Sequence, residues 1–220
     1  MSARVFCHRV LQFWFGNHRW QHEQPPAKAT GIEQSDLKRW FSSTKEFDEQ
    51  VKLNFEQDLT RLMNNEYRYP EDFNQPEDLL ACIVALDQFP RNIYRRDPRA
   101  FAYDDKAREF SQLLIKNGQD KQLPYVERGF AYLPFEHSEN LDDQNTCVKH
   151  MQQLIEDASQ DPDCKEELLG FLKEFLKASE HHREIIRQFG RFPHRNAILN
   201  RVSKENEEVF LTSGGARFGQ

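Results

Sequence analysis

The spacing of apolar residues along the chain restricts the choice of fold more than any other feature. In residues 171–189, apolar side chains recur in alternating steps of four and three, which places them along one face of an α-helix. In residues 47–62, apolar side chains also recur at three- and four-residue steps. The two-residue alternation typical of a half-buried strand is not sustained in any segment. The sequence therefore predicts an all-α protein.

Proline and glycine mark many of the expected helix ends. Pro76 stands where a first helical residue is favoured, and Gly16, Gly118 and Gly190 follow the last apolar residue of a run. Because the links are short, we expect about seven to nine helices packed as antiparallel pairs, in one domain over residues 1–220 with a frayed tail at 213–220. The expected helices cover residues 4–15, 47–62, 76–86, 98–117, 140–158, 162–189 and 203–211; residues 18–34 and 119–133 are expected to be a loop and a looser segment.

The composition excludes several classes of function. Hydrophobic residues make up 38% and charged residues 30%, which suits a globular chain, and the net charge of −6 argues against a nucleic-acid partner. Arginine is nevertheless concentrated in residues 86–108 and 181–201, with five in each segment. In an acidic protein, such segments favour a small anionic ligand or internal ion pairs.

The cysteines and the apolar N-terminal stretch indicate a cytoplasmic protein. The four cysteines are far apart and form no Cys-x-x-Cys pair, so neither a disulfide framework nor a structural zinc site is expected, and Cys82 in an apolar run is expected to be a buried thiol. Residues 5–15 are interrupted by polar side chains and are too short to span a bilayer. We expect no membrane partner and no cofactor.

Charged and hydrogen-bonding side chains are most concentrated in two segments that each contain a Phe-Pro pair. Residues 189–196 read Phe-Gly-Arg-Phe-Pro-His-Arg-Asn, and residues 87–92 read Asp-Gln-Phe-Pro-Arg-Asn. Each follows an apolar helical run, so the two turns are expected to project arginine and asparagine from helix ends into one locus. Either the charges pair internally, or they form an open site for an anion, with His194 the better candidate for proton transfer. The candidate residues are Asp87, Arg91, Asn92 and Arg95 in the first segment and Arg191, His194, Arg195 and Asn196 in the second.

A third candidate segment, residues 132–139, reads Tyr-Leu-Pro-Phe-Glu-His-Ser-Glu. Glu136, His137 and Glu139 could ligate a metal or transfer protons. A helix beginning after Pro134 explains the two glutamates as well, through the favourable charge–dipole interaction, and we favour this interpretation, with no metal. His182 lies on the apolar stripe of the longest helix, where a histidine is more often a hydrogen-bonded structural residue.

These segments resemble the bacterial family called domain of unknown function 924, and the likeness extends over almost the whole chain. Residues 13–16 and 100–104 fit that family as well. The resemblance implies a tetratricopeptide-like helical fold in a soluble cytoplasmic protein and implies no reaction. Asn200 replaces a glycine of the family pattern and can adopt a left-handed conformation. Lys204 replaces a helix-capping residue, and Ser203 is expected to cap instead.

Two functions remain open at this point. The first is a binding or catalytic site for a small anion, with arginines as the clamp and Asp87, Glu136, His137 or His194 as acid–base groups. The second is a helical scaffold for a peptide or protein partner, in which the polar motifs are structural. Because the charged residues gather at helix ends, and a peptide groove needs them along successive helices, we favour the first.

Overall fold

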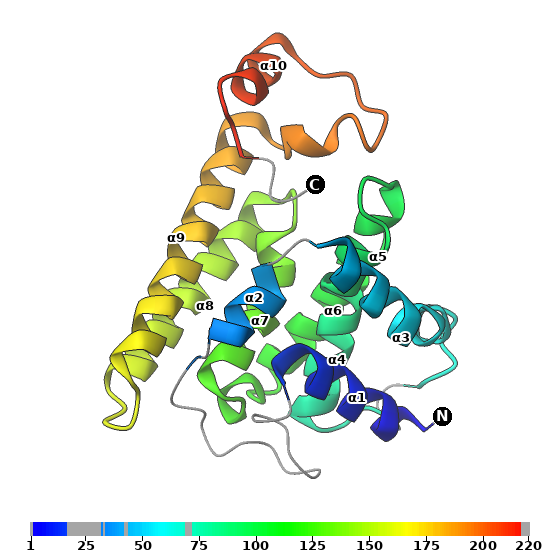
Figure 1. The fold of residues 1–220 in the computed structure, drawn as a ribbon. Helices are drawn as coiled ribbons and strands as arrows, with labels where there is room; N and C mark the ends of the chain where they lie inside the picture. Colours follow the sequence, from blue (N-terminus) through cyan, green and yellow to red (C-terminus); the bar gives the residue numbers. More distant parts are fainter. Residues whose placement is uncertain (1, 17–31, 33, 42–43, 69–71, 217–220) are drawn as a thin grey trace.

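The computed structural model describes residues 2–16, 32, 34–41, 44–68 and 72–216, and within them the regular structure is entirely helical. The all-α prediction is confirmed, with nine helices of eight residues or more and the five-residue α5 in the described ranges (Figure 1). The elements are α1 (Ala3–Phe15), α2 (Gln34–Phe41), α3 (Lys45–Met63), α4 (Pro76–Asp87), α5 (Phe89–Ile93), η1 (Pro98–Phe101), α6 (Asp104–Lys116), η2 (Asp120–Gln122), α7 (Tyr125–Glu136), α8 (Leu141–Ser159), α9 (Glu166–Phe189), η3 (Pro193–Arg195) and α10 (Glu205–Thr212).

Most of the expected helix ends are confirmed. Pro76 is the first residue of α4, and Gly190 ends α9 in the left-handed conformation with a φ of 71°. Asn200 also adopts a left-handed conformation, with a φ of 54°. The segment expected as a helix over residues 98–117 is divided, because Asp97 caps the short η1 and the regular helix starts again at α6.

The expected cap at Ser203 is wrong. The Glu207 carboxylate accepts the backbone N–H of Lys204 at 2.7 Å, while the Ser203 hydroxyl oxygen accepts a hydrogen bond from Asn196. Helix α2 was not among the helices expected from the sequence. Most of the loop expected over residues 18–34, and the last four residues of the expected frayed tail, lie outside the described residues.

Residues 119–136 depart most from the sequence prediction. They contain η2 and α7, and Pro134 lies in the last turn of α7, so the interpretation of Glu136 through a helix start after Pro134 is wrong. The helix that follows begins at Leu141, where the Asn140 side chain caps it. Every residue of α7 except Leu133 is buried. A helix that is covered on all sides has no polar face, and its sequence therefore lacks the amphipathic stripe by which helices are recognised.

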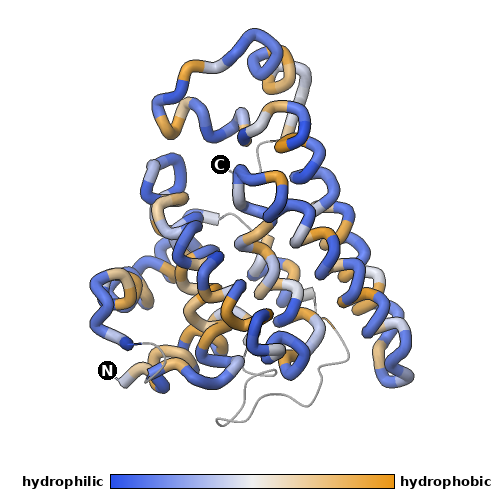
Figure 2. Tube along the Cα trace, turned by 180° about the vertical axis from the view of Figure 1, so that it is seen from behind, coloured by the Kyte–Doolittle hydropathy of each residue, from blue (hydrophilic) through white to orange (hydrophobic). Residues whose placement is uncertain are grey.

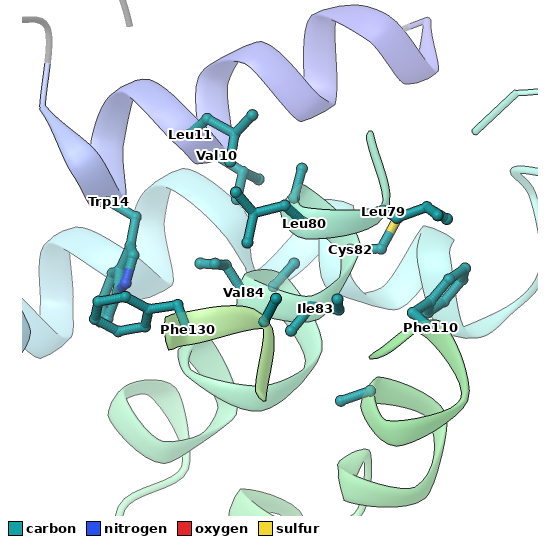
Figure 3. Close-up of a cluster of buried hydrophobic side chains, with 14 of the residues drawn as sticks. Val10, Leu11, Trp14, Leu79, Leu80, Cys82, Ile83, Val84, Phe110 and Phe130 are labelled. Atoms are coloured by element: carbon teal, nitrogen blue, oxygen red, sulfur yellow. The ribbon is translucent and has the colours of Figure 1, made fainter. Parts of the chain in front are cut away.

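The core forms where α1, α4, α6 and α7 pack together. Ten of the twelve residues of α4 are buried. This helix packs against α1 and α6, whose residues Val10, Leu11, Trp14 and Phe110 belong to the same apolar cluster (Figure 3). Figure 2 shows that hydrophobic residues gather where helices face one another and that hydrophilic residues cover the outer turns. Cys82 is fully buried, as expected.

The C-terminal segment covers one end of this core. Helices α8 and α9 form a hairpin against α7, and the chain after α9 turns back across the end of the molecule towards α5 and η1 (Figure 1). A second, small apolar cluster forms there from Ile185, Ile186, Phe189 and Phe192, with Phe210 packed against it. Among the described residues, no helix combines the length and the apolar composition that crossing a membrane requires. The single-domain organisation stays a prediction.

Candidate functional site

The ends of several helices meet around one small pocket beneath the C-terminal segment. The pocket contains about 320 Å³ of space not filled by atoms, part of it open to solvent. Its walls come from α5, η1, the end of α7, α9 and the segment around η3, so the three candidate sequence segments converge there. The lining residues in the described part of the chain are Arg91, Phe101, His137, His182, Phe192, His194 and Arg195.

Arg91 is held by the geometry of the α4–α5 junction. Pro90 is the second residue of α5, so the chain re-enters a helix directly after α4 and brings Arg91 back over Asp87. The Arg91 guanidinium donates to Asp104 Oδ1 and to the carbonyl oxygen of Ala100, both at 3.0 Å, and lies 3.4 Å from Asp87 Oδ1. This arginine is therefore fixed by two carboxylates that belong to different helices.

His137 and Asp87 form a second interaction across the pocket wall. His137 Nδ1 lies 2.7 Å from Asp87 Oδ1, and the Asp87 side chain is fully buried. Although burial alone would raise the pKa of Asp87, His137 and Arg91 hold it below its usual value. With Nδ1 donating to this carboxylate, a neutral His137 carries its lone pair on Nε2, which is the arrangement of an oriented acid–base group.

Arg195 crosses the pocket between two aromatic rings. The centre of its guanidinium lies 4.4 Å from the ring centroid of Phe101 and 4.7 Å from that of Phe192. Its Nη1 contacts Asp104 Oδ2 at 3.3 Å, and its Nη2 donates to the carbonyl oxygen of His137 at 2.9 Å. Burial lowers the pKa of Arg195 to about 10, so the side chain is charged at neutral pH.

Two further histidines complete the wall. His182 Nδ1 lies 2.8 Å from the carbonyl oxygen of Ala178 and 3.4 Å from Glu136 Oε1, so the structural hydrogen bond expected for it is present while its ring also lines the pocket. Burial lowers the pKa of His182. Burial also lowers the pKa of His194 to about 3, and the neighbouring Arg195, His182, Arg91 and His137 act in the same direction. His194 is therefore neutral at physiological pH.

Seven of the twelve candidate residues are not among the lining residues, and apart from Asp87 and Glu136 they pair with groups on other elements. Asn92 and Arg95 both donate to Asp48 of α3, at 2.8 Å for the shortest contacts. Arg191 donates two hydrogen bonds to Glu207 of α10, at 2.6 and 2.7 Å, and Asn196 donates to the same carboxylate. The Glu139 carboxylate accepts hydrogen bonds from the backbone N–H of Phe192 and from Arg201.

Of the residues expected to share one locus, Arg91, His194 and Arg195 line the pocket, Asp87 lies directly behind it, and Arg191 lies elsewhere. Phe101, Asp104 and Phe192 were not among the expected site residues. Two features of the sequence could have indicated them. Residues 100–104, which contain Phe101 and Asp104, resemble the family, and Phe192 lies inside the second Phe-Pro segment. Within the described ranges, no group of three or more His, Cys, Asp or Glu side chains is placed to hold a metal ion.

The fold and this site define an all-helical protein with an arginine- and histidine-rich pocket formed by the ends of its helices. The chain belongs to the family described as "Bacterial protein of unknown function (DUF924)", which matches residues 10–215. Among solved structures, it is similar to a protein of unknown function from Agrobacterium tumefaciens, with 27% identity, a TM-score of 0.75, and coverage of 97% of this chain and 100% of the other. The comparison with curated proteins finds no match.

Proposed function

We propose that this protein binds a small anion in the pocket beneath its C-terminal segment. The observation that supports this proposal most directly is the chemistry of the walls. Among the seven side chains that line the pocket in the described ranges, five are arginine or histidine and none is a carboxylate. Guanidinium and imidazole groups are hydrogen-bond donors suited to carboxylate or phosphate oxygens.

The size and position of the pocket agree with a compact ligand. The pocket is small, because the space of about 320 Å³ that is not filled by atoms includes open solvent. Phe101 and Phe192 flank Arg195 and restrict its guanidinium to one plane. A flat carboxylate group, or one face of a phosphate, fits such a fixed donor better than an extended peptide does.

The Asp87–His137 pair supports a catalytic role for the same site. A buried carboxylate at 2.7 Å from His137 Nδ1 orients the ring. His137 would then act as a general base that accepts a proton from a water molecule beside the bound anion. His194 is the second candidate for proton transfer, because it borders the same cavity.

Thermal melts with added anions test the binding proposal. Formate, acetate, phosphate and sulfate are compared with chloride at equal ionic strength. An anion at a hundredfold excess over its Kd stabilises the folded chain by about 2.7 kcal/mol, which corresponds to roughly 5–10 °C for a chain of this size. If none of the four anions raises the Tm above that in chloride, the proposal is wrong.

Substitutions of the lining arginines test whether the anion-dependent rise in Tm comes from binding in the pocket. Arg195→Gln removes the central donor, and Arg91→Lys retains a charge but loses the planar fork, so both should reduce the anion-dependent shift. Arg187→Gln is the matched control, because Arg187 lies on α9, which also supplies His182 to the pocket wall, but is itself exposed and pairs with Glu184. An equal anion response in all three variants would place the binding site elsewhere on the protein.

A further inference from the structure

Arg195 has one buried donor atom that the protein itself leaves unused. The residue is only 7% exposed. Nη1 contacts Asp104 and Nη2 donates to the carbonyl oxygen of His137, whereas the buried Nε has no hydrogen-bond partner in the described part of the chain. Leaving a buried N–H without an acceptor is unfavourable, and folded proteins seldom do so. Because Arg195 lines the pocket, an oxygen atom of a bound ligand can supply the acceptor.

Two other arginines of this chain show which acceptor fits that edge of a guanidinium. Arg191 donates from Nε and Nη2 to the two carboxylate oxygens of Glu207, at 2.6 and 2.7 Å. Arg95 uses the same two nitrogens with Asp48, at 2.8 and 2.9 Å. Each Nη carries two hydrogens, so the single bond that Arg195 makes from Nη2 leaves this atom a second N–H. The corresponding edge of Arg195 therefore favours a carboxylate group.

The charges around the pocket favour a ligand with a single negative charge. Asp104 contacts both lining arginines, Arg91 and Arg195, and Asp87 contacts Arg91 as well. Each guanidinium charge therefore already faces a buried carboxylate. A doubly charged phosphate would meet stronger repulsion from these two aspartates than a monocarboxylate would, because the repulsion grows with the charge of the ligand.

His137 adds a hydrogen-bonding group of a different kind. Its Nδ1 lies 2.7 Å from Asp87, and Arg91 helps to hold that carboxyl in its ionised, accepting form. Nδ1 therefore carries a hydrogen, and Nε2 accepts a hydrogen bond when the ring is neutral and donates one when the ring is protonated. A hydroxyl group suits Nε2 in both states, because it can donate and accept. A carboxylate oxygen suits only the protonated ring.

Arg195 and His137 lie close enough together to bind one short ligand. Arg195 Nη2 donates to the carbonyl oxygen of His137 at 2.9 Å, so the guanidinium lies against the backbone of the residue whose ring lines the same pocket. Phe101 and Phe192 flank the guanidinium and limit the remaining space. A carboxylate with a hydroxyl on the adjacent carbon is the shortest organic acid that carries both groups.

We propose that the pocket binds a small 2-hydroxy monocarboxylate, whose carboxylate accepts a hydrogen bond from Arg195 Nε and whose hydroxyl pairs with His137 Nε2. This inference rests on the proposed anion-binding function and adds the chemical class of the ligand. The two residues have separate roles. Arg195 binds the carboxylate of any such acid, and His137 distinguishes hydroxy acids from simple ones.

Calorimetric titrations with acetate, glycolate and fluoroacetate test the inference. All three are monoanions at about pH 7.5. Glycolate is acetate with a 2-hydroxyl group, and fluoroacetate has a fluorine atom of nearly the same size in its place. One additional hydrogen bond predicts that glycolate binds about two- to tenfold more tightly than acetate. Fluoroacetate should bind as acetate does, since fluorine cannot donate.

Variants of the two residues separate their roles. His137→Asn keeps a donor for Asp87 and lacks Nε2, so the ratio of glycolate to acetate affinity should fall to about one. His181→Gln, in an exposed position on α9, should keep the wild-type ratio. Arg195→Gln should weaken the binding of both ligands. Should His137→Asn fail to fold, the nitrogen resonance of His137 Nε2 in the wild-type protein should shift with glycolate and not with acetate.

The possible results distinguish this inference from the proposed function. Equal affinities for acetate and glycolate, or fluoroacetate binding as tightly as glycolate, overturn the inference and leave the anion site in place. The same holds if none of the three binds while phosphate or sulfate does. A preference for glycolate that persists in folded His137→Asn overturns the role of His137. The absence of binding by all three, together with no response to the other anions, overturns the proposed function itself.

Discussion

Single side chains of the pocket acquire their properties from partners on other elements. His194 follows a proline in a short turn, and in the sequence it has the character of an exposed, titrating histidine. In the fold it is largely buried beside Arg195 and Phe192, and its pKa falls to about 3. Neighbours separated from it by up to about a hundred residues cause this change.

The low pKa of His194 predicts a loss of stability in acid. In the unfolded chain the ring has its usual pKa of about 6.5, so below that pH the unfolded state binds more protons than the folded state. Between pH 6.5 and 5, the free energy of unfolding should therefore fall, by roughly 1 kcal/mol per pH unit from this group. His150 and His182, whose pKa values burial also lowers, contribute with the same sign.

Urea unfolding without added small anions, repeated at several pH values, measures this slope. The His194→Gln variant should show a shallower pH dependence than the wild-type protein, and His181→Gln should not. Parallel slopes in the wild-type protein and His194→Gln would show that His194 is not perturbed in the folded state.

Ion pairs join whole helices to one another. From the sequence alone, the charged residues in these pairs could have had either a structural or a ligand-binding role. Arg191, at the C-terminal end of α9, donates two hydrogen bonds to Glu207 of α10 and one to the carbonyl oxygen of Val202. The Glu207 side chain is fully buried and also accepts the N–H of Lys204. This interaction holds α10 against the end of α9.

The Arg191→Ala substitution should therefore release α10. It leaves the buried Glu207 carboxylate without its charged partner, so the variant should be less stable, with faster hydrogen exchange in α10. The hydrogen bonds from Arg191 hold the pKa of Glu207 at about 2, so their contribution is complete above about pH 4.5 and disappears as the pH falls towards 2. Arg187→Ala serves as the control, since its ion pair is exposed. Unchanged exchange in α10 after Arg191→Ala would assign Arg191 another role.

At the scale of the whole molecule, α7 links the core to the site. Phe130 packs against Trp14, Phe15, Trp40 and Phe175, with ring centroids 5.1 to 5.9 Å apart (Figure 3 shows Trp14 and Phe130). Phe130→Ala should lower the free energy of unfolding by about 3–5 kcal/mol, because it leaves a cavity among these rings. Leu53→Ala on the exposed face of α3 should change it by less than about 0.5 kcal/mol. Urea denaturation compares the two, and similar values would contradict the central place of α7.

Local chemistry was sufficient to predict the amphipathic helices, many of their ends, and the segments from which the pocket forms. The stripe of α9, Pro76 and Gly190 are recognisable because helical spacing and backbone preferences act over a few residues. The tertiary structure decided the position of α7, since full burial removes the polar face that reveals a helix. It also decided that Arg195 lines the pocket while Arg191, four residues earlier, pairs with Glu207. Whether a charged side chain meets a carboxylate or a cavity depends on which distant elements pack beside it, and packing brings those elements together only in the folded chain.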